Sequence, residues 1–493
     1  MTNKYQLFIN NEWVDPCSGR WFETLDPFSG EAWALIPQAN AEDVDRAVRA
    51  ADNAMRGPWR KLTASARGMM LHQLGALIEK NADALAEIES RDNGKLKSEV
   101  VGQIAYIAKY FYYYGGLADK IQGAVIPIDR PGVFNYTCYE PMGVVGTITP
   151  WNSSLLLTCW KLAPALAAGN TIVAKPSEFT SASMLEMAKL FLSAGFPPGV
   201  FNVITGFGAE AGEPLVTHPL VPRIAFTGGD AGGRRVNEMA AKHLKRVSLE
   251  LGGKSPNIVF DDADLEQAVN GVVTGIFSAG GQTCMAGSRL LLQESIHDEV
   301  VEKLLEITRR AKIGNPALPD TRVGPVATRQ QFEKVMHYID VAKREGARCV
   351  IGGHAPQGPE YGCGQIVEPT IFVDVKNSMT IAQDEVFGPV LVVLKFKDEE
   401  EAIHIANDIR FGLAAGVWTQ SLKRALQMTE RLKAGTVWVN NYRATSFTTP
   451  FGGFKDSGIG REGGIEAVKE YLEVKSVWMS SDLTMPDPFI RKY

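Results

Sequence analysis

VVGTI, residues 144–148, begins a block in which short β-rich runs alternate with helical segments. The further runs are TIVA (171–174), VFNVI (200–204), RIAF (223–226) and VSL (247–249), and the helical segments between them are 155–168, 181–194, 209–217 and 232–241. Alternation of this kind predicts an α/β fold, a parallel sheet with helices on its faces. Such sheets bind ligands at the carboxyl ends of their strands.

The residues upstream of this block predict a hairpin followed by helices. Residues 7–14 alternate through a turn at Asn10-Asn11, which is typical of a β-hairpin. We expect three helices further on: one after the N-cap Asn40, one over 63–93 up to the stop signal Asn93-Gly94, and one over 96–115.

Downstream, a second alternating block covers 257–440 and a glycine-rich stretch follows at 451–454. The weak alternation of 136–139 predicts an edge strand that pairs across subunits. The last residues, 482–493, are expected to form an arm on a partner subunit or to be partly disordered.

Composition narrows the classes of function. A chain of 493 residues is expected to form two or three domains. The net charge of -5 gives no basic footprint, so we expect no nucleic-acid partner. With no apolar run of about 20 residues and no signal peptide, we expect no membrane span and a cytoplasmic location. The six cysteines lack metal-ligand spacing, so we expect a reducing compartment and no metal site.

Three residues are candidates for chemistry. Cys284 follows Gly280-Gly281, which is typical of a closely approached loop, and it is either a nucleophile or a buried structural cysteine. Glu250 ends an apolar strand and is either a general base or a solvated strand end. Asn152 follows another strand and either donates to an oxyanion or caps a turn.

Other strand ends suggest a nucleotide site. Lys175 and Glu178 flank a turn, where they can hold ribose hydroxyls or form an exposed ion pair. The glycine-rich turn at 228–233 leads from a strand into a helix and can present N–H groups to phosphate, although it is not the GxGxxG fingerprint. Glu385 and Phe387 can hold a second ribose and a nicotinamide, or they are an ordinary strand entry.

In order along the chain, nine segments resemble the aldehyde dehydrogenase superfamily. They are PWN (150–152), WKLAPALAAGN (160–170), KPSE (175–178), FTGG (226–229), ELGGKS (250–255), GQTC (281–284), EVFGP (385–389), PFGG (450–453) and GIGRE (458–462). The resemblance implies NAD(P)-dependent oxidation of an aldehyde to a carboxylic acid through a thiohemiacetal and a thioester. It covers nearly the whole chain.

The resemblance implies a role for each catalytic candidate. By this resemblance, Cys284 stands at the position of the family's nucleophile and Glu250 at that of the base that activates the hydrolytic water. Asn152 stands at the position of the side-chain donor of the oxyanion hole. Lys161 and Glu462 match a buried pair that some members use as a proton relay, although a structural ion pair explains them equally well.

The implied cofactor is NAD, because the carboxylate of Glu178 repels a 2′-phosphate; Lys175 and Ser177 leave NADP open. Gly229 stands where the family usually has serine, which removes a hydroxyl near the phosphates. By position, the implied cofactor residues are Ile148, Trp151, Lys175, Glu178, Gly208, Gly228, Gly229, Gly233, Leu251, Glu385 and Phe387.

The implied substrate tunnel is lined by Ser153, Leu156, Leu157, Trp160, Thr283, Met285 and the loop 443–447. Ser153 replaces a residue that is often a large aromatic, which suggests a wider tunnel. Arg443 is the only cation there, so we expect it to attract a carboxylate and select a semialdehyde acid. The alternatives are an Arg443 that faces solvent or another subunit, and an aromatic or medium aliphatic aldehyde.

The resemblance also implies an architecture and an assembly. We expect a Rossmann-like cofactor domain over 1–122 and 144–252, an α/β catalytic domain over 253–450, and a small β oligomerisation segment over 123–143 and 451–493. A homodimer or homotetramer is expected. The rival functions are a CoA-acylating semialdehyde dehydrogenase, which generally lacks the glutamate retained at Glu250, a non-catalytic scaffold and a cysteine hydrolase.

Overall fold

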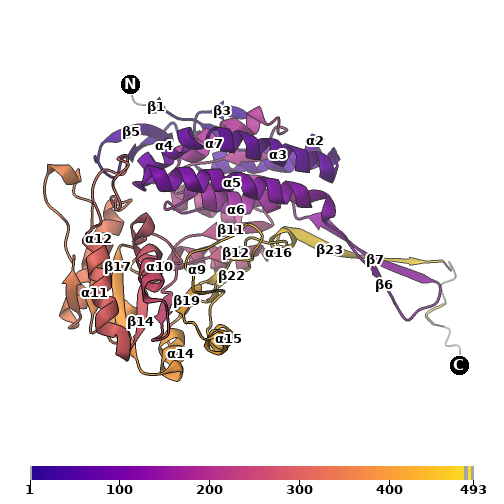
Figure 1. The fold of residues 1–493 in the computed structure, drawn as a ribbon. Helices are drawn as coiled ribbons and strands as arrows, with labels where there is room; N and C mark the ends of the chain where they lie inside the picture. Colours follow the sequence, from indigo (N-terminus) through magenta and orange to yellow (C-terminus); the bar gives the residue numbers. More distant parts are fainter. Residues whose placement is uncertain (1–2, 482–486, 490–493) are drawn as a thin grey trace.

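The computed structural model describes residues 3–481 and 487–489. Figure 1 shows two layered halves, one above the other, with a long arm projecting from them. At the centre of the first half is β8 (Val144–Ile148), in an eight-stranded sheet with the order β22-β12-β11-β8-β9-β10-β2-β3. The other strands are β2 (Leu7–Ile9), β3 (Glu12–Val14), β9 (Thr171–Lys175), β10 (Phe201–Val203), β11 (Arg223–Thr227), β12 (Arg246–Glu250) and β22 (Gly458–Ile459).

The five strands from β8 to β12 are mutually parallel, which confirms the predicted sheet. The predicted hairpin is confirmed as β2 and β3. Helices cover both faces of the sheet, because each presents one apolar side to it. They are α1 (Ala41–Arg56), α3 (Ala64–Lys80), α4 (Ala82–Asn93), α5 (Lys97–Leu117), α6 (Ser154–Ala167), α7 (Ala182–Ser193), α8 (Glu213–Thr217) and α9 (Asp230–Ala241), with a π-helical turn at Gly208–Gly212.

The single helix predicted over 63–93 is wrong: the structure has two, α3 and α4. Asn81 leaves the helical conformation at φ -103° and ψ 14°, and its Nδ2 donates to the carbonyl of Leu77 at 2.7 Å. A side-chain amide that binds the preceding turn in this way competes with the helical hydrogen bonds. The predicted stop is correct, since α4 ends at Gly94 with a left-handed φ of 72°.

The second half contains a seven-stranded sheet with the order β15-β16-β17-β14-β13-β19-β20, parallel except for β15. Its strands are β13 (Pro256–Val259), β14 (Arg289–Gln293), β15 (Arg348–Ile351), β16 (Thr370–Val373), β17 (Val390–Phe396), β19 (Ala414–Trp418) and β20 (Thr436–Val439). Its helices are α10 (Leu265–Phe277), α11 (His297–Thr308), α12 (Arg329–Arg344), α13 (Thr380–Gln383), α14 (Glu399–Asn407) and α15 (Leu422–Arg431).

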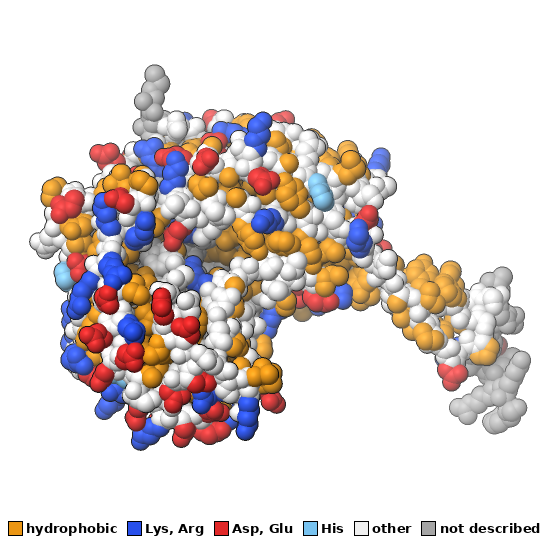
Figure 2. Space-filling view, viewed as in Figure 1, with side chains coloured by type: hydrophobic (Ala, Val, Ile, Leu, Met, Phe, Trp, Pro, Cys, Tyr) orange, Lys and Arg blue, Asp and Glu red, His pale blue; other side chains and the backbone are white. Residues whose placement is uncertain are grey.

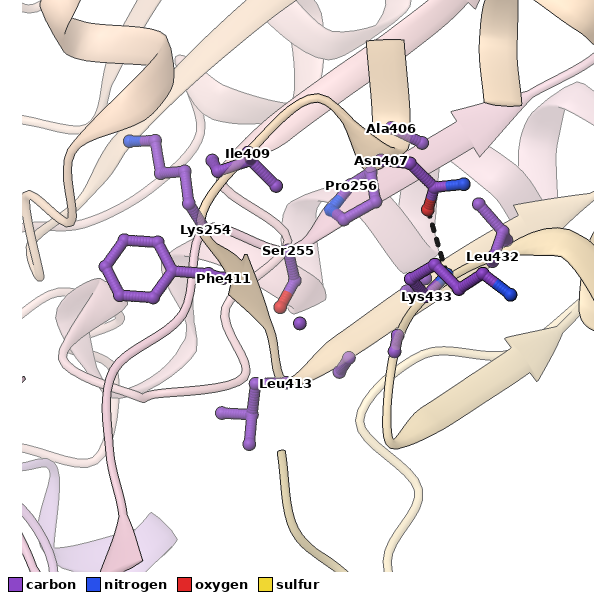
Figure 3. Close-up of a pocket in the computed structure, with 14 residues that line it drawn as sticks. Lys254, Ser255, Pro256, Ala406, Asn407, Ile409, Phe411, Leu413, Leu432 and Lys433 are labelled. Carbon is purple, nitrogen blue, oxygen red and sulfur yellow. Dashed lines mark hydrogen bonds between the residues drawn. The ribbon is translucent and has the colours of Figure 1, made fainter. Parts of the chain in front are cut away.

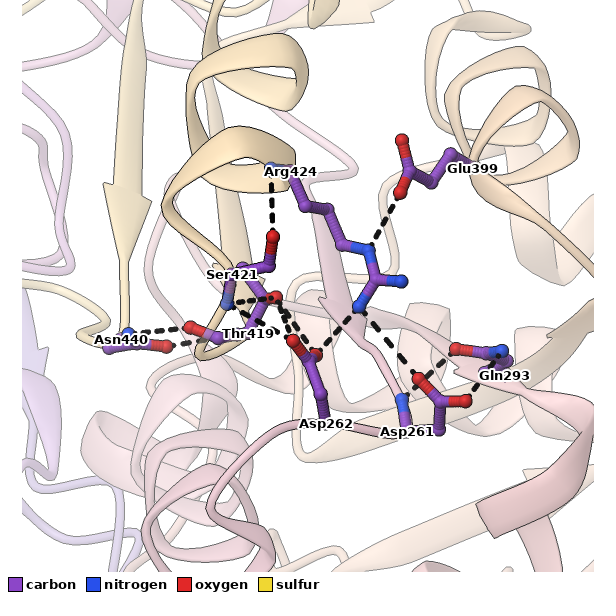
Figure 4. Close-up of polar contacts among 8 residues, drawn as sticks. All are labelled: Asp261, Asp262, Gln293, Glu399, Thr419, Ser421, Arg424 and Asn440. Atoms are coloured by element: carbon purple, nitrogen blue, oxygen red, sulfur yellow. Dashed lines mark hydrogen bonds and ion pairs between the residues drawn. The ribbon is translucent and has the colours of Figure 1, made fainter.

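A polar network ties the strand ends of this sheet to its helices (Figure 4). Arg424 of α15 pairs with Asp262, beyond β13, at 2.7 Å and with Glu399 of α14 at 2.8 Å. The hydroxyl of Thr419, after β19, donates to Asp262 at 2.8 Å. Because every charged side chain of this network has a partner, we assign the network to stability.

The arm consists of β6 (Val125–Ile126), β7 (Val133–Pro141) and β23 (Leu472–Ser480). The prediction that 136–139 forms an edge strand is wrong, because β7 lies between β6 and β23 and pairs with both. Phe134 and Trp478 are exposed on the arm, whose surface is largely apolar in Figure 2. Most of the predicted tail, 482–486 and 490–493, lies outside the described residues.

Smaller elements complete the fold: β1 (Asn3–Lys4), β4 (Trp21–Leu25), β5 (Ala32–Pro37), α2 (Pro58–Lys61), β18 (Phe411–Gly412), β21 (Phe454–Lys455) and α16 (Glu466–Lys469). Within the described ranges, no helix is both long and apolar enough to cross a bilayer. The same residues contain no group of three or more His, Cys, Asp or Glu side chains that could hold a metal ion.

Candidate active site

The ends of several strands meet in a cleft between the two sheets. The surface is hollowed where the two halves join (Figure 2). A cavity with about 580 Å³ of empty space lies there. It is lined by Pro150, Trp151, Asn152, Leu157, Thr227, Gly228, Gly229, Glu250, Leu251, Gly252, Cys284, Gln331, Lys334, Glu385 and Phe387. The three predicted catalytic residues therefore share one cavity with several predicted cofactor residues.

The loop that carries Cys284 is shaped by left-handed backbone. Ala279, Gly280 and Gly281 have φ values of 55°, 58° and 69°. A Cβ atom on Gly281 would lie 2.1 Å from the carbonyl oxygen of Gly388, so only glycine fits there. This close approach lets the loop turn back from α10 and place Cys284 at the cavity wall.

Burial and negative neighbours hold the thiol of Cys284 in its protonated form. Burial, together with the smaller effects of the carboxylates of Glu385 and Glu250, raises the pKa of Cys284 to about 12. The backbone N–H of Met285 and the guanidinium of Arg443 act in the opposite direction. Additional positive charge at the cavity would therefore favour the reactive thiolate.

The burial and hydrogen bonding of the Glu250 carboxylate suit a proton acceptor. It is only 5% exposed, which excludes a solvated strand end. Neither carboxylate oxygen has a hydrogen-bond partner among the described residues. Burial raises the pKa of Glu250 well above its ordinary value, and the nearby Glu462 adds to this, against Lys161 and Arg461. Such a carboxylate takes up a proton readily.

Asn152 lies directly before α6 and next to Cys284 at the cavity. Its Nδ2 donates to the carbonyl of Gln282 at 2.9 Å, which fixes the amide and leaves its second hydrogen for another acceptor. Lys161, also on α6, forms an ion pair with Glu462 and donates to the hydroxyl of Thr227 at 2.6 Å. Lys161 and Glu462 are both buried.

Ile148 and Lys175, which are not among the lining residues of the cavity, lie opposite each other at the carboxyl ends of β8 and β9. The ammonium of Lys175 is buried and donates to the carbonyl of Pro176 at 3.1 Å. Its side chain lies 3.6 Å from where a Cβ of Gly212 would be, which places it against the turn that begins at Gly208. Glu178, three residues after Lys175, is partly exposed.

The start of helix α9 is suited to bind an anion. Helix α9 begins after Gly229, and no side chain caps its first turn, so backbone N–H groups are open to a ligand. A Cβ on Gly233 would lie 2.3 Å from the side chain of Leu251, so Leu251 would have to move before a larger residue could stand at this point of α9. Gly229 has open space on its Cβ side.

The near end of the cleft carries an acidic and an aromatic residue. Glu385 accepts a hydrogen bond from the N–H of Gly253 at 2.9 Å, and burial raises its pKa. Phe387 meets Trp151 edge-on with 5.4 Å between the ring centroids. Gln331 supports this turn by donating to the carbonyls of Val386 and Phe387 at 2.8 and 3.0 Å.

Gln331 and Lys334 are cavity residues that the sequence did not reveal. Both lie on α12, whose polar positions are typical of a solvated helix face. By contrast Lys254, in the same segment as Glu250, lines a separate small pocket with Ser255 (Figure 3). Burial lowers the pKa of Lys254 to about 7, and its ammonium has no hydrogen-bond partner among the described residues.

Of the predicted substrate residues, Leu157 is among those that line the cavity with Cys284; Ser153, Trp160, Thr283, Met285 and Arg443 are not. Trp160 stacks on Tyr110 with 5.8 Å between centroids. Met285 and Leu156 pack against the same core. Ser153 follows Asn152 and accepts a hydrogen bond from the ammonium of Lys95 at 2.8 Å, and Thr283 precedes Cys284 and accepts one from Arg443 at 3.3 Å. The predicted wall is mainly apolar and aromatic.

Arg443 is bound to the loop that carries Cys284. Its Nη1 donates to the carbonyls of Ser278 at 3.1 Å and Thr274 at 3.3 Å, and its Nη2 donates to the hydroxyl of Thr283 at 3.3 Å. Its backbone has a left-handed φ of 66°. Much of its hydrogen-bonding capacity is therefore used within the protein.

Comparison with known proteins gives a consistent result. Residues 13–477 match the model of the aldehyde dehydrogenase family. The chain is 47% identical to an aldehyde dehydrogenase of Emericella nidulans over 96% of this chain and 94% of that one. It is 46% identical to the (Z)-2-((N-methylformamido)methylene)-5-hydroxybutyrolactone dehydrogenase of Acinetobacter baylyi, over 99% and 100% of the two chains.

Solved structures agree. An NAD+ complex of a Bacillus cereus aldehyde dehydrogenase superposes with a TM-score of 0.95 at 44% identity, covering 97% of both chains. The betaine aldehyde dehydrogenase of Staphylococcus aureus, also with NAD+, gives 0.97 at 39% identity and covers 99% and 97% of the two chains. This chain belongs to the aldehyde dehydrogenase family.

Proposed function

We propose that this protein oxidises an aldehyde to a carboxylic acid with NAD, through a thioester on Cys284 that water hydrolyses. The observation that carries the proposal is the position of Glu250. Its buried carboxylate, without a partner among the described residues, lines the same cavity as Cys284 and Asn152. A nucleophile, a base and an amide donor around one cavity suit acyl transfer through a covalent intermediate.

In the first step the Sγ of Cys284 attacks the aldehyde carbon, and its proton is lost to solvent or to Glu250. The oxygen of the resulting thiohemiacetal gains negative charge. The free hydrogen of the Asn152 amide and the backbone N–H of Cys284 can donate to it. Because the amide is already held by Gln282, little reorganisation is needed when the charge forms.

The residues around the cleft fit NAD. Lys175, Glu178 and Gly208 would hold the adenosine ribose end, the start of α9 at Gly228, Gly229 and Gly233 the pyrophosphate, and Glu385 and Phe387 the nicotinamide ribose, with Ile148, Trp151 and Leu251 beside it. NAD held by these residues would supply the acceptor for the hydride that leaves the thiohemiacetal carbon. The NAD+ complexes of the B. cereus and S. aureus relatives support this assignment. The carboxylate of Glu178 favours NAD, and Lys175 leaves NADP use open.

In the second step Glu250 removes a proton from water, which attacks the thioester carbon. The carbon–sulfur bond breaks, the acid leaves, and Cys284 recovers its proton. The raised pKa of Glu250 suits this transfer, because a stronger base removes the proton more easily. The ion pair of Lys161 and Glu462 lies close enough to Glu250 to shift its pKa, and it serves either as a proton relay or as a structural pair.

Two classes of substrate were expected from the sequence, semialdehyde acids and apolar aldehydes. Arg443 donates to two backbone carbonyls and a hydroxyl, so its charge is shared with groups of the protein. The side chains of Leu157, Trp160 and Met285 are apolar. These contacts favour an uncharged aldehyde over a semialdehyde acid.

We further propose the division into a cofactor domain (1–122 and 144–252), a catalytic domain (253–450) and an oligomerisation segment (123–143 and 451–493). The exposed apolar side chains of the arm, including Phe134 and Trp478, support a homodimer or homotetramer. We expect the protein in the cytoplasm, with no nucleic-acid or membrane partner.

The decisive experiment measures reduced-nucleotide formation from a panel of aldehydes with NAD or NADP and without CoA. Wild type should turn over, and Cys284→Ser should lose at least about 10⁴-fold, as for other removed nucleophiles. Turnover only after CoA is added would instead place the protein among acylating dehydrogenases and refute the role of Glu250. Turnover that persists in Cys284→Ser would refute the thioester.

A further inference from the structure

The loop that carries Cys284 begins at a turn whose backbone is unfavourable for its own residues. Helix α10 ends at Phe277, and Ser278 (φ -60°, ψ 143°) and Ala279 (φ 55°, ψ 28°) then have angles close to those of a type II turn. Such a turn places its third residue in the left-handed region, where glycine is usual and alanine costs free energy. Turning over the peptide group between Ser278 and Ala279 would give Ala279 a right-handed conformation. The observed orientation therefore needs support from outside the turn.

Two side chains of opposite charge hold this peptide group from its two sides. The guanidinium of Arg443 donates to the carbonyl oxygen of Ser278 at 3.1 Å, and a carboxylate oxygen of Glu99 accepts from the N–H of Ala279 at 3.1 Å. The cation thus faces the negative end of the peptide dipole, and the anion faces the positive end. If the peptide group turned over, its carbonyl would face Glu99 and its N–H would face Arg443. Both contacts would then be repulsive.

The guanidinium of Arg443 spans the whole turn. It also donates to the carbonyl of Thr274 within α10 and to the hydroxyl of Thr283, which precedes Cys284, both at 3.3 Å. Burial lowers the pKa of Arg443, and the carboxylate of Glu99 counteracts this, so the two charges lie near each other. Glu99 lies in the first turn of α5, in the other half of the molecule. The turn is therefore held from both halves.

A chain of hydrogen bonds leads from this peptide group to the proposed oxyanion donor. The carbonyl of Ala279 accepts from the N–H of Gln282 at 3.1 Å, and the carbonyl of Gln282 accepts from the Nδ2 of Asn152 at 2.9 Å. Gln282 lies two residues before Cys284. Because one short loop makes all these contacts, a change in the orientation of the peptide group would move Cys284 relative to Asn152.

Resting on the proposed function, we infer that Glu99 and Arg443 are positioning residues for formation of the thioester. By holding one peptide group from opposite sides, they keep the Cys284 loop in the turn that brings the thiol and the Asn152 amide to the same aldehyde. Neither residue is among those that line the cavity, so we expect neither to contact the aldehyde. Arg443 then acts on the loop of the enzyme and not on a substrate carboxylate.

The test compares Glu99→Leu, which removes the acceptor, with Glu99→Gln, whose amide oxygen still accepts from the N–H of Ala279. With NAD and a neutral aldehyde, pentanal, kcat/KM should fall about 10²-fold in Glu99→Leu, the effect of a displacement of about 1 Å, and stay within about threefold of wild type in Glu99→Gln. Hydrogen–deuterium exchange of residues 278–284, measured by mass spectrometry without aldehyde, should be at least about tenfold faster in Glu99→Leu alone.

Gln293→Leu is the matched control. Gln293 is also partly exposed and accepts from a backbone N–H, that of Asp261 at 3.0 Å, but it lies at the end of β14 away from Cys284. This variant should leave both kcat/KM and the exchange of residues 278–284 unchanged.

Two further variants test the turn itself. Ala279→Gly removes the cost of a left-handed backbone, so Glu99→Leu/Ala279→Gly should recover at least about fivefold of the lost kcat/KM. Arg443→Met should lower kcat/KM and speed exchange as Glu99→Leu does, and it decides the question if Glu99→Leu fails to fold.

An unchanged kcat/KM or an unchanged exchange rate in Glu99→Leu overturns the inference. An equal loss in Glu99→Gln also overturns it, because the hydrogen bond to Ala279 would then not be the cause. Failure of the proposed function is distinct: wild type itself would show no Cys284-dependent turnover, while the exchange measurements would still report on the turn.

Discussion

Two buried glutamates near the cleft have opposite surroundings. One carboxylate oxygen of Glu462 forms an ion pair with the ammonium of Lys161, and this ammonium also donates a hydrogen bond to the hydroxyl of Thr227. Glu250 lies close enough for Glu462 to raise its pKa, yet neither of its oxygens has a partner among the described residues. A buried carboxylate without a partner costs stability and gains proton affinity. The difference agrees with the proposed role of Glu250 as a base and with a structural role for the ion pair of Glu462.

The largest effect that tests this comparison is on hydrolysis. Glu250→Gln should slow deacylation by about 10²–10⁴-fold, because the amide cannot accept the proton of water. Rapid mixing should show a burst of reduced NAD of about one equivalent per site, followed by slow turnover. Glu302→Gln, an exposed carboxylate on α11, serves as control and should behave as wild type. Full steady-state activity in Glu250→Gln would remove it from the mechanism.

Glu250→Gln should lower activity but should leave the stability of the fold unchanged or increase it. The pKa of Glu250 is raised in the folded state, so its ionised form costs stability as pH rises above the ordinary carboxylate pKa. Glu250→Gln should therefore unfold at the same or a higher urea concentration than wild type at pH 7. Any such gain should disappear below pH 4, where the wild-type carboxyl is protonated in both states.

The next effect concerns the ion pair. Lys161→Met leaves Glu462 buried without its cation and should cost about 3–5 kcal/mol, measured by urea unfolding. Lys189→Met breaks an exposed pair with Glu186 and should cost about 1 kcal/mol or less. Lys161→Met/Glu462→Leu should recover much of the loss. A Lys161→Met protein of normal stability with slow deacylation would instead show that the pair is a proton relay.

The smallest effect is the pH dependence. In the proposed mechanism both Cys284 and Glu250 act after losing a proton, and the pKa of each is raised above its ordinary value. Steady-state turnover should therefore increase from neutral to alkaline pH, by at most about tenfold per unit for each group that limits the rate. In Glu250→Gln the part of this rise that comes from deacylation should be absent. A turnover that falls above pH 7 would contradict the raised values.

Much of the fold was predictable because its signals are local. The apolar runs from 144 to 250 became the five parallel strands of one sheet, since each buries both faces between helices. Asn40 and Gly94 marked helix ends through their own conformations. Two predictions failed where a local signal was overruled. Asn81 interrupts a helix through a side-chain hydrogen bond. Residues 136–139 lie in the middle strand of their sheet, paired with 474–477 from the far end of the chain.

The chemical groups of the site and their order along the chain can be read from the amino acids alone: a cysteine among glycines, a glutamate and an asparagine at strand ends, and turns suited to phosphate. The surroundings of these groups depend on how the chain folds. Burial without partners at Glu250, the contact of Lys95 with Ser153, and the entry of Gln331 and Lys334 into the cavity all join distant segments. Desolvation and hydrogen bonding depend on every neighbour in space, and no local pattern contains that information.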